Sequence, residues 1–284
     1  MRYLTLLTFF AAVLFSLNIE MPQKSVANGK TAFLEFTKKD GVSYEKLILD
    51  KKEYIIYEHP RDAKKLYALV PIDYYEKPSS KTIKLIYKQD AKEMSKTVHL
   101  EVKDGLYKKE ILQVQQSKVT LNDKDKKRAA KEYAEAMDVY NASTSKSYIT
   151  SKFIAPMQSK ITSEFGKARV YNNTLKGYHS GTDYRASVGT PIVATNDGVV
   201  ALVKDRFYSG GSVIIDHGHG IYTCYFHMSK FDVKKGQEVK KGEPIGLSGK
   251  SGRVTGPHLH FSARVASEQV DPLQLIELLN KNLF

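Results

Sequence analysis

The sequence has a single cysteine, Cys224, and no tryptophan among its 284 residues. One cysteine cannot form an intramolecular disulfide, which excludes the disulfide-stapled class of small secreted domains. A chain of this length can bury a substantial core in one or two domains. If the chain is exported, its stability must therefore come from core packing or from a bound metal.

Long apolar runs are also scarce, and the one that stands out lies near residue 1. The chain begins with Met-Arg, continues with an uncharged run from Tyr3 to Leu17, and reaches the small residues that end at Ala27. This pattern is typical of a secretory signal peptide, and we predict one over residues 1–27 with cleavage after Ala27. An uncleaved membrane anchor is the alternative, although the run is shorter than the roughly 20 residues of a span. We expect a periplasmic or cell-envelope protein.

Acidic residues are outnumbered. The chain has 44 Lys and Arg against 31 Asp and Glu, a formal net charge of +13. A basic surface suits an anionic partner. Because no nucleic-acid-binding module is recognisable in a chain that we expect to be exported, we predict no nucleic acid as a partner. Peripheral association with an acidic wall polymer or a membrane surface fits better, and we expect a monomer.

The chain reads as mainly β, in two domains. Residues 28–104 contain short alternating strands separated by turns, which predicts a small N-terminal β-sandwich. Residues 105–150 add a strand-like piece and a charged helix over 120–143, a connector between the domains. Residues 151–284 form a second, glycine-rich β domain that ends in an amphipathic helix covering one end of the core. We also expect the N-terminal domain to lie near the cleft of the second domain and to limit access to it.

Six of the eight histidines lie between residues 179 and 260. In "HSGTD", His179 and Asp183 would be roughly 13 Å apart on a straight strand, too far to share one ion with bonds near 2 Å. Only a curled loop brings them together, and the glycines around them permit one. Paired with a downstream H-x-H, they make a plausible three-ligand metal site of the kind that leaves a fourth position open for catalysis.

The downstream motif is "GPHLHF". Alternate side chains of a strand share a face, so His258 and His260 point the same way, about 7 Å apart. Both could ligate one metal, or one could ligate while the other moves protons; the spacing leaves this open. His227 ends a strand whose alternation places Thr223 and Tyr225 on its face. His217 and His219 flank a tight turn and are expected to have turn or supporting roles, and Cys224 is expected in the core.

Four segments carry a resemblance in their order and spacing: "HSGTDY", "GTPIVATNDGVV", "IIDHGHGIYTCYFHM" and "GPHLHF". Over residues 153–272 the chain resembles the lysostaphin-type or LytM-type zinc endopeptidases of bacterial cell walls. The resemblance implies an antiparallel β fold of the duplicated hybrid or barrel-sandwich type. It also implies one Zn²⁺ per chain bound by His179, Asp183 and His260, with His227 and His258 as the catalytic pair.

This resemblance predicts a secreted zinc metallopeptidase that hydrolyses peptide bonds in peptidoglycan, with stem peptides and cross-links as partners. Zinc-assisted hydrolysis needs proton-transfer groups beside the metal, which the two further histidines would supply. A cross-link endopeptidase is the favoured interpretation. A carboxypeptidase that trims stem peptides is one alternative, and a non-enzymatic activator of cell-wall amidases is another. Activators of this fold have lost metal ligands, whereas every ligand position here is filled. A biotinyl or lipoyl carrier domain is disfavoured because no modifiable lysine lies in the required setting.

Overall fold

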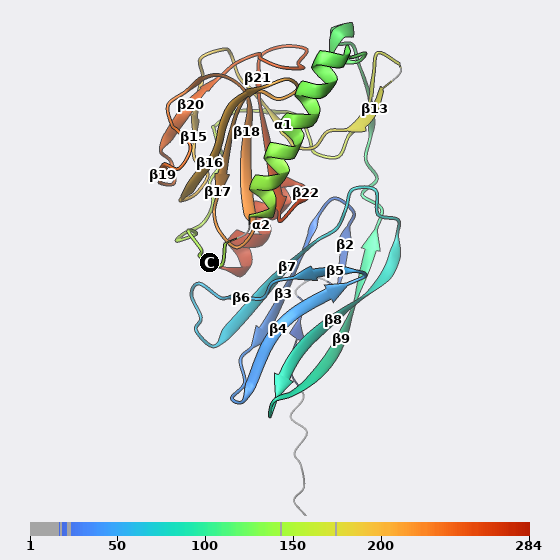
Figure 1. Ribbon diagram of the computed structural model, residues 1–284, viewed down its shortest axis with the longest axis vertical. Helices are drawn as coiled ribbons and strands as arrows, with labels where there is room; N and C mark the ends of the chain where they lie inside the picture. Colours follow the sequence, from blue (N-terminus) through green and yellow to red (C-terminus); the bar gives the residue numbers. More distant parts are fainter. Residues whose placement is uncertain (1–16, 18, 22–23, 143, 174) are drawn as a thin grey trace, which may run out of the picture.

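The computed structural model describes residues 17, 19–21, 24–142, 144–173 and 175–284, which form two β domains (Figure 1). The N-terminal domain occupies one end of the molecule. The second domain occupies the other end, with helix α1 (Asp123–Asn141) lying across its sheet. The mainly β fold predicted from the sequence is confirmed. Residues 1–16 of the predicted signal peptide lie outside the described part of the chain.

The N-terminal domain is a sandwich of two sheets. One sheet has the order β1-β3-β7-β6 and the other β2-β9-β8-β4-β5. Along β8, Ile83 and Leu85 are fully buried while Lys84 between them is exposed, as expected of a half-buried strand. The apolar faces of the two sheets enclose one core. The strands are β1 (Ile19–Glu20), β2 (Ser25–Ala27), β3 (Thr31–Thr37), β4 (Val42–Leu49), β5 (Lys52–Tyr54), β6 (Tyr57–Glu58), β7 (Lys65–Pro71), β8 (Ser79–Gln89) and β9 (Lys92–Lys103).

The start of this domain differs from the boundary predicted at residue 28. Strand β2 pairs in parallel with β9, and β1 pairs with β3. Leu17 and Val26 are both buried in the sandwich core. These segments contribute apolar side chains and backbone hydrogen bonds to the fold, so cleavage after Ala27 would remove two strands from it. The polar residues in this region interrupt the hydrophobic alternation that would have predicted these two strands from the sequence.

The second domain is built on one ten-stranded sheet whose main path runs β11-β14-β21-β18-β17-β16-β19. Along β21 (His258–Val265), Leu259 and Phe261 point into the apolar core, so His258 and His260 lie on the opposite face. The other strands are β11 (Ile161–Ser163), β14 (Thr182–Arg185), β15 (Pro191–Val193), β16 (Gly198–Arg206), β17 (Gly210–Asp216), β18 (Ile221–Phe231), β19 (Glu238–Val239), β20 (Pro244–Ser248) and β22 (Glu268–Val270).

The segment between the domains takes part in the second domain. Strand β10 (Lys109–Leu112) pairs in parallel with β12 (Ala168–Tyr171), which also pairs with β13 (Leu175–Tyr178). The strand-like piece predicted in this region is therefore more than a connector. It brings side chains from the N-terminal half of the chain next to the segment that precedes His179.

Helix α1 confirms the strongest helix signal in the sequence. Asn122 caps it by accepting a hydrogen bond from the backbone N–H of Asp125, and the helix ends at Asn141. Its buried face packs on the sheet, where the Tyr140 hydroxyl lies 3.4 Å from the sulfur of Cys224. Cys224 is fully buried, as predicted for a core residue. In the part of the chain that the structure describes, no helix is long and apolar enough to span a bilayer.

The two domains share an apolar cluster. It combines Phe33, Tyr67 and Leu69 of the sandwich with residues of β18, β21 and helix α2 (Pro272–Asn282). Helix α2 lies at the junction of the two domains, close to the C-terminus (Figure 1). The side chain of Gln274 makes two hydrogen bonds of 3.0 Å to the backbone of Thr31. The predicted C-terminal helix therefore covers the end of the core against which the N-terminal domain packs.

His217 and His219 are buried near the turn between β17 and β18. His217 donates from Nδ1 to the carbonyl of Asp197 at 2.7 Å, and its Nε2 lies 2.7 Å from the Thr223 hydroxyl. His219 accepts from the Tyr67 hydroxyl at 2.7 Å, which ties the domains together, and stacks on Tyr57. Burial lowers the pKa of both imidazoles, for His217 to about 4. The supporting roles predicted for these two residues fit their surroundings.

We expect the protein to lose stability as the pH falls below about 6.5. The folded state keeps His217 neutral down to about pH 4, whereas the unfolded chain takes up the proton near pH 6.5. The stabilisation is complete above pH 6.5 and should decrease by about 3 kcal/mol on approach to pH 4. Urea unfolding at a series of pH values measures this. The His217→Asn variant should have a flatter curve, and identical slopes for the two proteins would contradict the assignment.

Candidate metal centre

Asp183 and His260 face each other across two neighbouring strands. Strands β14 and β21 are antiparallel, with Asp183 in register with His260 and Arg185 in register with His258. Residues in register on adjacent strands project to the same side of the sheet. Because Tyr184 and Leu259 fill the core on one side, the carboxylate and both imidazoles lie on the other side.

A curled loop brings His179 to the same place. It precedes β14, and its ring is fully buried. A Cβ atom at Gly181 would lie 2.4 Å from the carbonyl oxygen of Phe261 and 2.6 Å from Nε2 of His260, so only glycine permits this close approach. The sequence prediction that a glycine-containing loop must fold His179 back towards Asp183 agrees with this geometry.

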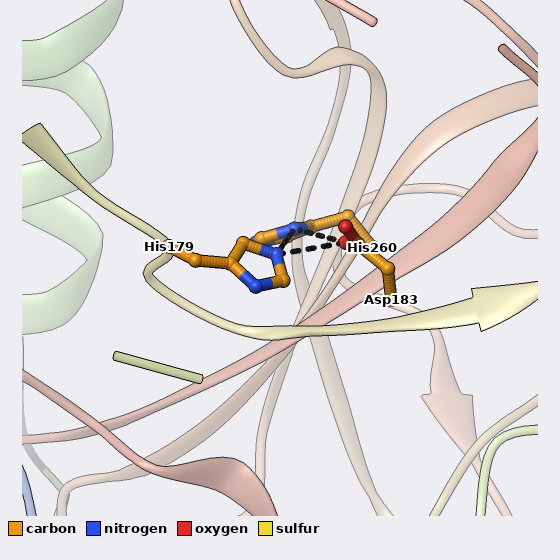
Figure 2. A group of neighbouring side chains, drawn as sticks. All are labelled: His179, Asp183 and His260. Carbon is orange, nitrogen blue, oxygen red and sulfur yellow. Dashed lines mark hydrogen bonds and ion pairs between the residues drawn. The ribbon is translucent and has the colours of Figure 1, made fainter. Parts of the chain in front are cut away.

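Three ligand atoms converge (Figure 2). Nε2 of His179 lies 2.9 Å from Oδ1 of Asp183 and 3.0 Å from Nδ1 of His260, which is itself 2.8 Å from the same carboxylate oxygen. Three ligand atoms, one from each residue, all lie within 4.8 Å of one another. In tetrahedral coordination with bonds near 2 Å, neighbouring ligand atoms are separated by about 3.3 Å, so these spacings are close to those a single ion requires.

Hydrogen bonding supports a metal at this point. Nδ1 of His179 lies 2.7 Å from the carbonyl oxygen of Glu164, which can only accept, so Nδ1 carries the proton. Nε2 of His179 is then unprotonated, and its lone pair faces the carboxylate of Asp183 and the imidazole of His260. Two imidazole nitrogens and one carboxylate oxygen form a donor set suited to Zn²⁺. The residues present therefore fit a zinc ion.

The second oxygen of Asp183 has a cationic partner. Nη2 of Arg169, on β12, lies 3.3 Å from Oδ2 of Asp183, and Nε of the same guanidinium donates to Glu110 at 2.9 Å. Glu110 belongs to β10, the segment between the domains. Burial alone would raise the pKa of Asp183, but its contacts with His179 and His260 outweigh burial and hold that pKa well below its usual range. The carboxylate is therefore ionised and ready to bind a cation.

His258 lies beside the three ligand atoms. Its Nδ1 donates to the carbonyl oxygen of Gly256 at 2.8 Å, which leaves Nε2 bare. That Nε2 is 3.6 Å from Oδ1 of Asp183, farther than either of the other imidazole nitrogens. The spacing of the H-x-H motif could not tell which histidine lies closer to the other ligands. In the structure His260 is the closer one.

His227 completes the group from strand β18. Its Nδ1 donates to the carbonyl oxygen of Ser251 at 2.8 Å, so its Nε2 is also bare. Its ring centre is 4.8 Å from that of His258. Burial lowers the pKa of His227, as do the neighbouring imidazoles, and burial lowers that of His260 to about 4. Both rings are therefore held neutral, and a neutral imidazole can accept a proton or bind a metal ion.

The prediction that His227 shares a strand face with Thr223 and Tyr225 is wrong. The register between β17 and β18 shifts between the Gly211–Met228 and Val213–Tyr225 pairs, a β-bulge that contains His227. His227 has a φ of 63°, rare for a non-glycine residue. Tyr225 stays in the core with Thr195, while the bulge turns His227 towards His258. Strain of this kind is found at functional positions.

Sequence reasoning missed two arginines in the site. Arg169 contacts Asp183, and Arg253 lines both cavities beside the ligands, of about 160 and 270 Å³. Arg169 depends on a pairing with Glu110, 59 positions earlier in the chain, that no local pattern reveals. Arg253 stands five residues before His258 in a loop, and only the motif next to it could have drawn attention to it.

Comparisons with known proteins agree with this architecture. Residues 177–272 match the model of peptidase family M23, and this range includes the five candidate site residues His179, Asp183, His227, His258 and His260. This match lies within the second domain, and the resemblance to lysostaphin- and LytM-type enzymes is confirmed. A crystal structure of a candidate M23 peptidase from Pseudomonas aeruginosa superposes with a TM-score of 0.67 and 26% identity, covering 88% of this chain and 94% of that one.

Two curated relatives are informative. The peptidoglycan DD-endopeptidase ShyA of Vibrio cholerae is 43% identical over 122 residues, which is 42% of this chain and 28% of ShyA. The DD-carboxypeptidase/endopeptidase Mpg of Neisseria meningitidis is 42% identical over 97 residues, which is 34% of this chain and 22% of Mpg. The similarity thus spans about a quarter of the length of these relatives.

Proposed function

We propose that this chain is a zinc metallopeptidase that hydrolyses peptide bonds in peptidoglycan, with the cross-link between stem peptides as its main target. The convergence of His179, Asp183 and His260 on one point is the observation that carries the proposal. The family match and the names of the curated relatives support the same chemistry. One Zn²⁺ per chain would be held by Nε2 of His179, Nδ1 of His260 and the carboxylate of Asp183.

Each neighbouring side chain has a role that follows from its geometry. A zinc ion held by the three ligand residues would supply the Lewis-acid chemistry that polarises a carbonyl group and activates water. His227 and His258 each keep a bare Nε2 because their Nδ1 protons are held by backbone carbonyls. A neutral imidazole in this position can accept a proton from water and then, as the donor, stabilise the developing negative charge or protonate the leaving amine. Arg169 contacts Asp183 and orients its carboxylate.

Two alternative functions are weighed against this one. A carboxypeptidase would use the same residues on the terminal bond of a stem peptide, and the name of the Neisseria relative includes both activities. A non-enzymatic activator of amidases would not need a complete site. Here all three ligand positions and both proton-transfer positions are filled and close together, which favours an enzyme.

The proposed substrate implies a location. Peptidoglycan lies in the cell envelope, and we propose that the protein acts there as a periplasmic monomer. The formal charge of +13 would favour contact with anionic wall polymers or membrane surfaces.

Digestion of purified sacculi tests the proposal. Zinc-loaded protein should release soluble muropeptides in which cross-linked dimers are replaced by monomers, as identified by mass. Exhaustive chelation should abolish the release, and added zinc should restore it.

Other products would redirect the proposal. Loss of terminal D-alanine with intact dimers would identify a carboxypeptidase. No product from the zinc-loaded chain, combined with stimulation of an added amidase, would identify an activator. Full activity after chelation, with no metal detected, would refute a metallopeptidase.

A further inference from the structure

Arg253 lies beside the candidate catalytic residues His227 and His258. The loop between β20 and β21 carries it, and its side chain lines both cavities that flank the metal ligands. Among the residues that the structure describes, no carboxylate lies within ion-pair distance of its guanidinium. An arginine presents five N–H donors in a planar fork that matches a carboxylate.

Two tyrosine rings hold this guanidinium. Its central carbon lies 4.3 Å from the ring centre of Tyr171 and 4.5 Å from that of Tyr208. Such contacts stabilise the cation and restrict its rotamers while leaving its N–H edge unpaired. The side chain is thus held in place before any ligand binds, which lowers the entropic cost of binding.

The loop itself is fixed to the catalytic face. The backbone N–H of Arg253 donates to the carbonyl of Tyr208 at 2.8 Å. The neighbouring Gly252 has a φ of +81°, and a Cβ there would lie 2.5 Å from that same carbonyl oxygen. Two residues before Arg253, the carbonyl of Ser251 orients the His227 ring. Arg253 therefore keeps a defined position relative to a proton-transfer residue.

Other arginines of the site do not fill the same role. Arg169 is neutralised by Glu110 and Asp183 and is largely buried. Arg185 lies on the same face of the sheet, in register with His258, but is exposed and lines neither cavity. Of the two arginines that line the cavities, Arg253 is therefore the one whose charge is not neutralised by a carboxylate of the described residues.

We propose that Arg253 binds a free carboxylate of the peptide next to the scissile bond and so selects for substrates that carry one. This inference rests on the proposed function. In a D-alanyl–diaminopimelate cross-link, the carbon that carries the scissile amide nitrogen also carries a carboxylate. A cross-link in which that group is a carboxamide, or a glycyl bridge that lacks it, would be a poor substrate.

A matched pair of substrates tests the proposal. A synthetic D-alanyl–diaminopimelate cross-linked peptide is prepared with this carboxylate either free or converted to carboxamide, and kcat/KM is measured for full-length zinc-loaded protein. Arg253→Gln should lose about 10- to 100-fold on the free carboxylate, as expected for the loss of a charge-assisted bidentate hydrogen bond. On the carboxamide it should change less than about 3-fold.

Control variants separate local from general effects. Arg185→Gln should leave the ratio of the two substrates unchanged. Tyr208→Phe should retain the preference, whereas Tyr208→Leu, which removes one ring of the clamp, should reduce it. Zinc content and circular dichroism confirm that each variant is folded and loaded. An equal loss on both substrates for Arg253→Gln would overturn the proposal.

Calorimetric binding of the same two peptides distinguishes this inference from the proposed function. If wild-type protein cleaves neither peptide but binds the free carboxylate more tightly, and loses that preference in Arg253→Gln, the carboxylate site stands and the proposed reaction fails. If wild-type protein cleaves both peptides equally well, the reaction stands and the carboxylate site fails.

Discussion

The His260→Ala and His258→Ala variants should fail in different ways. His260→Ala removes Nδ1 from the three converging ligand atoms, so purified protein should retain little zinc and no measurable hydrolysis. His258→Ala leaves all three ligand atoms in place and should keep close to one zinc per chain. It should nevertheless lose on the order of 10²-fold or more in rate, because a proton-transfer or oxyanion-stabilising group is gone.

Metal analysis and muropeptide release, measured on the same preparations, check this difference. His227→Ala should behave like His258→Ala, since its Nε2 is bare and its ring lies next to that of His258. His217→Ala provides a control for the removal of a buried imidazole away from the ligands; it should lower stability without lowering zinc content. If His258→Ala loses zinc as fully as His260→Ala, both histidines are ligands and the assignment is wrong.

Replacement of Arg169 by Gln should destabilise the metal-free protein strongly. The guanidinium bridges Glu110 and Asp183; its removal leaves the buried Asp183 carboxylate without its cation and leaves Glu110 paired with Lys167 alone. Breaking a buried ion pair costs about 3–5 kcal/mol. Zinc should recover part of this loss, because the ion restores a positive charge at Asp183. Urea unfolding with and without zinc measures both effects.

Lys126→Gln is the control. Lys126 pairs with Asp123 within helix α1 at 3.2 Å, and both side chains are exposed. Exposed pairs contribute about 1 kcal/mol or less, so this variant should lose little stability and respond to zinc as wild type does. An equally small loss for Arg169→Gln, or no additional recovery with zinc, would contradict a role for Arg169 at the metal centre.

The clustering of the candidate metal-binding residues could be predicted because the sequence information behind it is local. His179 and Asp183 lie within five residues, and His258 and His260 flank one leucine. Strand alternation then places both histidines on one face, and the glycine at 181 permits the loop that returns His179 to that face. The evidence for the helix over 120–143 was also local, because the capping residue and the helix-forming residues lie in one segment.

What could not be predicted depends on contacts between distant segments or on broken periodicity. The bulge at His227 breaks the alternation on which the face assignment relied, and bulges leave no reliable signal in one sequence. The pairing of β10 with β12 joins residues some 59 positions apart. Burial of Val26 against the sandwich was hidden because the same residues also resemble a cleavage site.

The pairing of β10 with β12 also changes how the role of the N-terminal domain should be tested. We predicted that residues 28–104 limit access to the cleft. The wall of the larger cavity beside the ligands includes Glu110, Leu112 and Val114, which lie outside that range. A chain shortened to begin near Ser151 would lose these residues and the partner of Arg169 together with the sandwich. Its activity could not report on the sandwich alone.

Anomalous diffraction from zinc-loaded crystals tests the metal centre most directly. Data collected on both sides of the zinc absorption edge should give one peak per chain, bonded to Nε2 of His179, Nδ1 of His260 and the carboxylate of Asp183. The imidazoles of His227 and His258 should remain outside bonding distance. A peak bonded to His258, or no peak between these three residues, would contradict the account.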